Sequence, residues 1–190
     1  RDVAPSRGLG DVYKRQVGEI PIQTGVSPTG AKTYTVPIQV YPGINGFEPQ
    51  LSLAYNSQQG NGIVGIGWGI GGVQSIMRTS RNIYYDGKPQ GALRTKADAF
   101  VLDGMRLIKI SENATTINYE SEQGNIKVKA FLSGDVVKYF EVFYPNGTKG
   151  IFGYASNTSN KIFYPIVSLS DLRNNQILYT YVCLLYTSPS

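Results

Sequence analysis

The sequence contains no histidine, and its single cysteine, Cys183, stands in the last eight residues. The rest of the chain therefore has no imidazole base, no thiol nucleophile and no cysteine or histidine ligand for zinc. It also has no apolar run near the ~20 residues that a membrane-spanning helix needs. These absences exclude zinc enzymes and thiol enzymes, and we predict no cofactor, no metal and no membrane span.

Both ends of the chain resemble translated DNA adaptor. Residues 9–16 read LGDVYKRQ and residues 183–190 read CLLYTSPS. One adaptor, similar to the transposon end used to prepare sequencing libraries, encodes both segments when it is translated in opposite orientations. We therefore interpret residues 1–16 and 183–190 as non-native, and residues 17–182 as the natural sequence. The alternative for the first segment is a genuine basic arm.

The charge of the natural segment is small. The whole chain has 18 Lys and Arg against 13 Asp and Glu, and residues 1–16 hold four of the basic and two of the acidic residues. Residues 17–182 therefore carry a net charge of about +3. A nucleic-acid-binding domain shows a clustered basic face, so we predict no nucleic acid partner.

Alternation of apolar and polar residues indicates an all-β fold of antiparallel strands and hairpins, a fragment of a larger β-sandwich or β-shell. Gly, Asn and Asp dipeptides that close tight hairpins stand at 45–46, 86–87, 103–104, 124–125, 134–135 and 146–147. No segment shows a helical stripe, and no linker divides the chain. We expect strands near residues 34–40, 51–56, 73–79, 100–102, 105–110, 116–121, 126–131, 139–144, 149–154, 163–169 and 176–181.

Residues 34–78 are the most informative stretch. Apolar residues alternate at 34, 36, 38 and 40, which predicts one buried and one wet face, and Pro37 favours an edge strand. Glycines at 65, 67, 69 and 71 alternate with Ile66, Trp68 and Ile70. This pattern predicts a strand whose glycine face lets another backbone or an aromatic ring approach closely.

A nucleotide motif in this stretch fails on its context. Residues 60–65 match the G-x-G-x-x-G fingerprint of dinucleotide sites, and Asp86 stands near the usual acidic position. That fingerprint needs a helix directly after it, whereas the glycine-rich residues 66–71 make a poor helix. We interpret the glycines as packing residues.

Carboxylates offer weaker signs of catalysis. Glu120 and Glu122 match the E-x-E pair of ADP-ribosyltransferases, but the upstream Arg and Ser-Thr-Ser strand of that family are not evident. A pair of acids for glycoside cleavage could come from Asp86, Asp98, Asp103 and Asp171, and no pair is indicated. Aromatic pairs at 84–85 and 163–164 could form a glycan platform, although such residues are also ordinary strand formers.

One family resemblance covers essentially all of residues 17–182. The spacing Y-x-x-P-I-x-V-x-P-G-x-N-G-x-x-P-x-L-S-L-x-Y-N-S-x-x-G-N-G-x-x-G-x-G-W from residue 34 resembles the opening of the SpvB/TcaC N-terminal family. Residues 98–107 (DAFVLDGMRL) and 168–181 (SLSDLRNNQILYTY) resemble its later blocks, with Asn174 in place of the more usual glycine. The motif residues that we assign a structural role are Pro42, Gly43, Asn45, Gly46, Tyr55, Asn56, Ser57, Gly60, Asn61, Gly62, Gly65, Gly67, Trp68, Asp103 and Gly104.

The resemblance implies a non-catalytic β-module near the N-terminus of a secreted or surface-exposed bacterial protein related to toxins and Rhs/YD repeats. In this family a β-shell encloses or precedes a C-terminal effector, which would carry any enzymatic activity. The implied partners are the remainder of the same chain and other toxin-complex subunits. Two alternatives stay open: a surface adhesin or glycan-binding β-domain, and an ADP-ribosyltransferase that uses Glu120 and Glu122.

Overall fold

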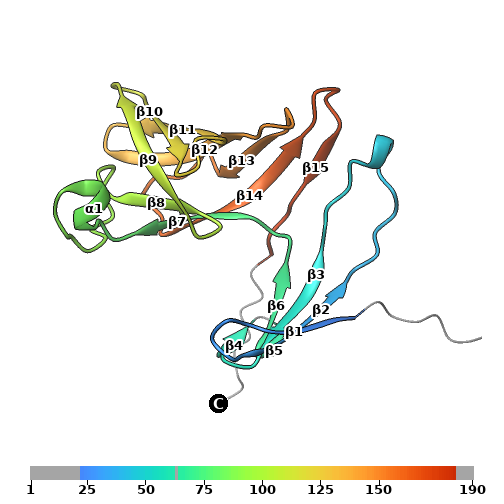
Figure 1. Ribbon diagram of the computed structural model, residues 1–190. Coiled ribbons are helices and arrows are strands. Elements are labelled where there is room, and N and C mark those ends of the chain that lie inside the picture. The colour runs from blue at the N-terminus through green and yellow to red at the C-terminus, as the bar shows by residue number, and fades with distance from the viewer. Residues whose placement is uncertain (1–21, 63, 183–190) are drawn as a thin grey trace, which may run out of the picture. The chain divides into compact units, whose positions relative to one another are not determined.

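The computed structural model describes residues 22–62 and 64–182 (Figure 1). The predictions for residues 1–16 and 183–190 lie outside the described residues. The chain divides into two compact units, one from residues 1–40 and 50–72 and the other from Tyr41–Pro49 and Val73–Ser190. We call them the sheet unit and the barrel unit. The sequence shows no linker or change of composition at this division, and it therefore predicts no boundary between two units.

The sheet unit holds a four-stranded antiparallel sheet in the order β1-β2-β3-β6. Its strands are β1 (Gln23–Val26), β2 (Lys32–Pro37), β3 (Ser52–Asn56) and β6 (Trp68–Gly71), and a separate hairpin pairs β4 (Asn61–Gly62) with β5 (Gly65–Ile66). Strand β1 was not expected, because its segment has no alternating pattern. It forms by pairing with β2 across a turn in which the Ser27 hydroxyl accepts a hydrogen bond from the Ala31 N–H (3.0 Å).

The prediction that Pro37 marks an edge strand is wrong. Strand β2 lies between β1 and β3. However, β1 pairs only with residues 32–35, so Pro37 faces a partner strand on one side only, where it lies opposite Ser52. The missing N–H of proline therefore interrupts no ladder on the side of β1.

Within the sheet unit, the buried face that the sequence predicts for residues 34–40 is not formed in β2, and β3 has no buried residue either. Every residue of the two strands is half-buried or exposed. Tyr34 is 37% exposed, Ile70 is 42% exposed and Ile66 is 77% exposed. The alternating pattern thus describes a sheet whose apolar side chains the rest of the sheet unit leaves uncovered.

The expected single glycine-rich strand is broken at Gly67, which separates β5 from β6. Gly67 has a φ of +77°, and a Cβ atom at this position would lie 2.6 Å from Cε2 of Tyr55. Both the backbone conformation and the close ring require glycine here. The expected approach of an aromatic ring therefore occurs at Gly67, but at a break in the strand.

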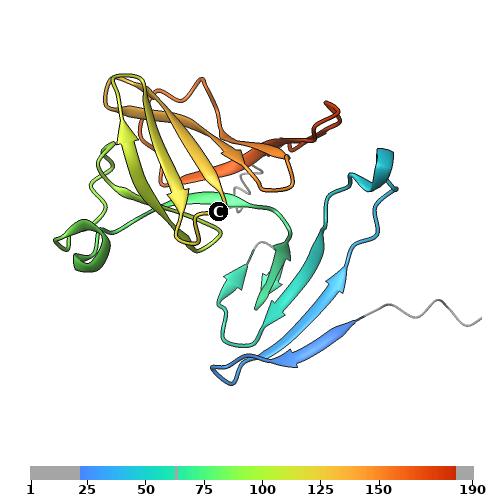
Figure 2. The same ribbon diagram turned by 45° about the horizontal axis from the view of Figure 1, so that its top comes forward.

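The barrel unit is a closed antiparallel meander (Figures 1 and 2). Each strand from β7 to β13 pairs with the next, and β14 returns to pair with β7, so these eight strands form a ring. The all-β fold of antiparallel strands and hairpins that the sequence predicts is thus confirmed. The strands are β7 (Ser75–Thr79), β8 (Ala99–Leu102), β9 (Met105–Glu112), β10 (Thr116–Ser121), β11 (Lys127–Ser133), β12 (Val136–Phe143), β13 (Lys149–Gly153) and β14 (Phe163–Ser170). A short β15 (Gln176–Leu178) pairs with the end of β14 beyond its contact with β7.

Most of the predicted turn dipeptides connect neighbouring strands of this barrel. Residues 103–104, 124–125, 134–135 and 146–147 all lie in such connections. The prediction for residues 86–87 is wrong, because Asp86 ends a one-turn helix α1 (Ile83–Asp86) and Gly87 is its left-handed C-cap. The side chain of Asn82 caps the start of α1 by accepting the Tyr85 N–H (2.9 Å).

The interior of the barrel is filled with side chains, as expected for eight strands. Phe100 packs edge-on against Phe140 and Tyr164, with ring centroids 5.0 Å and 6.3 Å away. These three rings and the aliphatic side chains around them are fully buried. The buried cluster comprises Ile76, Phe100, Leu102, Leu107, Ile117, Tyr119, Ile126, Val128, Ala130, Val137, Phe140, Val142, Phe152, Tyr164 and Ile166.

A buried arginine lies beside the seam where β7 meets β14. The Arg78 side chain is 0% exposed, and its guanidinium pairs with Asp98 at 2.9 Å. It also donates to the carbonyl oxygens of Lys161 (3.0 Å) and Thr95. The guanidinium carbon lies 4.7 Å from the centre of the Phe100 ring. One side chain thus ties β7 to the segments that precede β8 and β14.

Two further groups extend this network to β12. The Asn160 side-chain oxygen accepts bonds from Arg78 (3.1 Å) and from the Val137 N–H (2.9 Å). The Tyr164 hydroxyl donates to the Val137 carbonyl (3.1 Å) and accepts the Lys161 N–H (3.1 Å). The network therefore satisfies the buried charge with groups from several strands at once.

Burial and hydrogen bonding shift the pKa of the Asp98 carboxyl in opposite directions. Burial alone would raise the pKa of Asp98, but hydrogen bonds from the backbone N–H groups of Leu93 and Thr95 and from Arg78 hold that pKa below its ordinary value. A lowered pKa in the folded state means that the ionised form stabilises the fold. This contribution is present above the ordinary pKa of an aspartate and is lost as the pH falls through the lower, folded value.

We expect Gly67→Val to lower the free energy of unfolding by more than ~1 kcal/mol, since the side chain would collide with Tyr55 at a positive φ. Urea denaturation of the purified chain measures the change. Gly91→Val is the matched control, because a Cβ there meets no atom within 4 Å and φ is not positive. Equal midpoints for the Gly67 variant and the unchanged protein would contradict the close packing described here.

We expect Asp98→Asn to lower the free energy of unfolding by roughly 3 kcal/mol at pH 7, because it leaves the Arg78 charge buried without its partner. The difference from the unchanged protein should shrink as the pH falls from about 4, the ordinary pKa of an aspartate, through the lower pKa that Asp98 has in the folded chain. Denaturation curves at several pH values measure both effects. Asp135→Asn serves as the control, because that side chain is 83% exposed and should change stability by less than about 0.5 kcal/mol. A pH-independent difference for Asp98→Asn would refute the ionic role.

Candidate functional site

The family-motif residues lie in three separate places, and the first is the loop between β2 and β3. Pro42, Gly43, Asn45 and Gly46 surround a 3-10 turn η2 (Ile44–Gly46) in this loop. Asn45 and Gly46 both have positive φ values, of 56° and 74°. A Cβ on Gly43 would overlap the Phe47 carbonyl. The predicted turn is present, and these residues shape its backbone.

The second group forms an aromatic row across the sheet unit. Tyr55 lies directly opposite Tyr34 on one side and Trp68 on the other. The ring centroids are 5.7 Å apart for Tyr34 and Tyr55 and 5.2 Å apart for Tyr55 and Trp68. Such cross-strand aromatic pairs stabilise neighbouring strands.

Polar motif residues fasten the ends of the same strands. The Asn56 N–H donates to the Gly67 carbonyl (2.9 Å), and the Gly67 N–H donates to the Gly60 carbonyl (3.0 Å). The Ser57 hydroxyl accepts the Lys32 N–H (2.9 Å). These contacts hold the β4–β5 hairpin close to the β3–β6 pair.

The fingerprint at residues 60–65 forms the β4–β5 hairpin, with Asn61 opposite Ile66 and Gly62 opposite Gly65. A strand, β6, follows it, where a dinucleotide site would need a helix N-terminus. A Cβ on Gly62 would overlap the Trp68 carbonyl. The glycines here serve backbone packing, and the geometry gives no place for a pyrophosphate.

The third group, Asp103 and Gly104, forms the turn between β8 and β9 in the barrel unit. The Asp103 carboxylate accepts the Ser75 N–H (2.8 Å). Burial raises the pKa of Asp103, and this hydrogen bond opposes the rise. The pair fixes a hairpin to β7. The motif residues as a set therefore build turns and close contacts and do not converge on one reaction centre.

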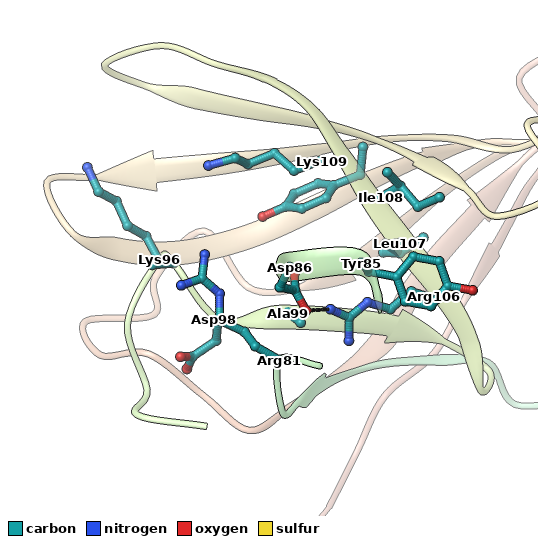
Figure 3. A pocket seen from close by; sticks show the side chains of 12 residues that line it. Arg81, Tyr85, Asp86, Lys96, Asp98, Ala99, Arg106, Leu107, Ile108 and Lys109 are labelled. Atoms are coloured by element: carbon teal, nitrogen blue, oxygen red, sulfur yellow. Dashed lines mark hydrogen bonds and ion pairs between the residues drawn. The ribbon is translucent and has the colours of Figure 1, made fainter. Parts of the chain in front are cut away.

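A cavity of about 240 Å³ on the barrel unit is the best-formed hollow with convergent polar groups (Figure 3). It lies among α1, the segment before β8, and strands β9 and β10. Arg106 and Asp86 form an ion pair at 2.5 Å inside it, drawn as a dashed line in Figure 3. Its lining is Arg81, Tyr85, Asp86, Lys96, Ala97, Asp98, Ala99, Arg106, Leu107, Ile108, Lys109 and Tyr119.

Arg106 is held on several sides. It donates to the Ser80 carbonyl (3.0 Å), and its guanidinium carbon lies 5.6 Å from the centre of the Tyr85 ring. The Tyr85 hydroxyl in turn donates to the Glu122 carboxylate. That hydrogen bond raises the pKa of Tyr85, with a smaller contribution from burial. These contacts fix α1 against the barrel wall.

Two lysines lie at the rim of the cavity. Lys96 pairs with Asp135 (3.2 Å) and Glu112 (3.4 Å), and Lys109 pairs with Glu112 (2.9 Å). The hydrogen bond to Asp135 raises the pKa of Lys96, and the bond from Lys109 lowers the pKa of Glu112. Both ammonium groups are on the same side of the view in Figure 3.

The carboxylates considered for catalysis are occupied by structural contacts. Glu122 accepts the Tyr85 hydroxyl, while Glu120 lines a different, open hollow on the barrel. Asp171 accepts the backbone N–H groups of Arg173 and Asn175 within a turn. Asp86 and Asp98 do line one cavity, but each is paired with an arginine.

No motif in the sequence marks the basic lining of the cavity. Its cations come from separate segments, at residues 81, 96, 106 and 109, and no spacing marks them. The one feature of the sequence that could have indicated this cavity is Arg106, a charged residue among the apolar residues of β9. In residues 22–62 and 64–182, no cluster of three acidic, histidine or cysteine side chains has the geometry for a metal ion. The same residues contain no helix with the length and hydropathy to span a membrane.

Two solved structures have a fold similar to that of this chain. No curated protein matches the chain. The crystal structure of TcdB2-TccC3 is similar with a TM-score of 0.71 at 20% identity, over 90% of this chain and 9% of that one. The crystal structure of TcdB2-TccC3-TEV gives a TM-score of 0.70 at 18% identity, over 100% of this chain and 9% of the other. At these identities the likeness shows the fold, and this chain spans a small share of the length of both structures.

The sequence comparison identifies the family. Residues 26–171 match the family described as "Salmonella virulence plasmid 65kDa B protein" (SpvB). This match covers most of the chain, including the sheet unit's β2, β3 and β6 and all the strands of the barrel. It confirms the resemblance that the motif at residues 34–68 indicated. The chain belongs to the SpvB family.

Proposed function

We propose that this chain is a structural module of a secreted bacterial toxin-related protein, which contributes β-sheet to a shell around or ahead of a C-terminal effector. The family and the likeness to toxin-complex structures support a toxin-related β-module. Its partners in this proposal are the remainder of its own chain and other toxin-complex subunits. The module itself carries no catalysis, and any enzymatic activity belongs to the effector.

The observation that carries the proposal is the uncovered sheet unit. Its large apolar side chains are exposed to an extent that a stable free-standing sheet does not tolerate, including Ile22 (52%), Val26 (72%) and Ile66 (77%). A four-stranded sheet without a buried face needs other elements to cover it. Further β-structure of the same protein is the natural cover, because apolar residues that alternate with polar ones along a strand suit packing between sheets.

The contacts of the carboxylates support a role without catalysis. An ADP-ribosyltransferase that used Glu120 and Glu122 would need both at a site for NAD, whereas Glu122 is held by Tyr85 and Glu120 lines a separate hollow. On this account a purified chain hydrolyses no NAD. Turnover that Glu122→Gln removes would reverse this part of the proposal.

A glycan-binding adhesin is the second candidate, favoured by one observation. Tyr84 is 84% exposed on α1 and packs edge-on against Tyr85 at 4.7 Å. An exposed aromatic ring can stack on a sugar face. Binding on a glycan array that Tyr84→Ala abolishes would favour this candidate over the shell.

The shell role predicts that the longer protein protects the sheet unit. We expect hydrogen–deuterium exchange at residues 52–56 and 64–71 to be at least about tenfold slower in the complete protein than in the 190-residue chain. The double substitution Ile66→Ser and Ile70→Ser should remove most of this added protection, because it deletes apolar surface that the cover would bury. In the isolated chain the same substitutions should change stability by less than about 1 kcal/mol.

Ile110→Ser is the matched control, since Ile110 is an exposed isoleucine (58%) of the barrel unit. It should leave exchange in the sheet unit unchanged in both proteins. Equal exchange rates in the complete protein and the isolated chain would rule out a cover over the sheet unit.

A further inference from the structure

Two unsatisfied groups face one cavity. Among the residues that the structure describes, the buried side-chain polar atoms without a hydrogen-bond partner are Nε of Arg81 and the hydroxyl of Tyr119. Both residues line the cavity of about 240 Å³ next to α1. Buried polar groups are nearly always paired, so two orphans at one hollow call for a specific explanation.

Tyr119 presents a neutral donor to the cavity. Its side chain belongs to the barrel core, and the residue is only 3% exposed. Its ring packs edge-on against Phe100 at 5.9 Å. Burial raises the pKa of Tyr119, and the nearby negative charge of Glu112 raises it further, against a smaller opposing effect of Arg78. The hydroxyl therefore keeps its proton at neutral pH and can donate it to an acceptor in the cavity.

Arg81 presents the guanidinium edge that suits a carboxylate. Its Nη1 donates a long bond to the Gln90 side chain (3.4 Å), and its backbone pairs with Gln90 as well. This contact occupies Nη1, and Nε on the other edge of the guanidinium has no hydrogen-bond partner. The two parallel N–H groups of such an edge match the two oxygens of a carboxylate.

The charges around the cavity leave one positive charge uncompensated. Arg106 pairs with Asp86, and Asp98 pairs with Arg78 from the core side. Lys96 and Lys109 share Glu112 and Asp135. In the described part of the chain, Arg81 is the cation of this lining for which no ion pair is found. The lining therefore matches a ligand with a single negative charge.

We propose that this cavity binds a small monocarboxylate, with Arg81 holding both carboxylate oxygens and Tyr119 donating a hydrogen bond to one of them. The volume is below the range of drug-sized sites, which fits a short acid or a single acidic side chain. The carboxylate comes either from a free acid or from an Asp or Glu of another polypeptide segment, since the chemistry at the cavity is the same. The site does not depend on the shell role proposed above.

The test is an NMR titration of the ¹⁵N-labelled 190-residue chain with sodium acetate, with the blocked peptide acetyl-Gly-Glu-Gly-amide, with inorganic phosphate and with acetamide. We expect acetate and the peptide to shift resonances of the cavity lining with saturation, and acetamide to give no saturable shift. Tighter binding of the peptide than of acetate would identify a polypeptide source, and the reverse order a free acid. Binding of phosphate as tight as that of both carboxylate probes would overturn the assignment to a monocarboxylate.

Two variants test the named contacts. Arg81→Gln should weaken binding of the tighter carboxylate at least about tenfold, because it removes a charge-assisted pair of hydrogen bonds. Tyr119→Phe should weaken it about threefold to tenfold. It should not lower the melting temperature of the ligand-free chain, since its hydroxyl has no partner to lose.

Arg173→Gln and Tyr139→Phe are the matched controls, an exposed arginine of a turn and a tyrosine that stacks on Phe131 away from the cavity. Both should bind the carboxylate as the unchanged chain does. The proposal is overturned if neither carboxylate gives a saturable shift, or if binding is the same in Arg81→Gln and Tyr119→Phe as in the controls.

Discussion

The barrel of this chain depends on a buried ion pair at its seam, between Arg78 and Asp98. A meander of eight strands becomes a barrel only where its last strand returns to its first, and Arg78 on β7 lies beside this junction. Its guanidinium contacts Asp98, Asn160 and the hydroxyl of Tyr164. A charge that is out of water must satisfy its donors within the protein. The partners of Arg78 are therefore fixed in position, and they fix the ends of β8, β12 and β14 with them.

Two neighbouring groups of polar side chains in the barrel unit, which meet at Asp98, differ in how fully they are paired. Around Arg78 the buried polar groups find partners on β12 and β14 and in the segments that precede β8 and β14. In the cavity beside α1 the pairing is incomplete, because Nε of Arg81 and the hydroxyl of Tyr119 are buried without partners. This contrast is why we assign the second cluster to a ligand and the first to stability.

Local sequence patterns predict most strands and hairpins of the fold. The features that they do not predict depend on contacts between residues far apart in the sequence. Strand positions followed from alternation, and most hairpins followed from turn dipeptides such as Asp103-Gly104. Barrel closure could not be read, since it rests on the pairing of segments near residues 75 and 165 and on the fit of Arg78 between them. The dipeptide at residues 86–87 was misassigned because a left-handed glycine serves a helix end as well as a hairpin. The cavity lining escaped notice because its cations are scattered along the sequence.

The proposed function rests on the sheet unit. Its motif residues, among them Gly67 and Trp68, build close backbone contacts and an aromatic row, yet its apolar side chains stay exposed. In the proposed shell, other β-structure covers this sheet. The most direct measurement is a cryo-EM reconstruction of the complete protein that contains this chain. The account predicts that other β-structure covers β3 and β6, and solvent against both faces of this sheet would contradict it.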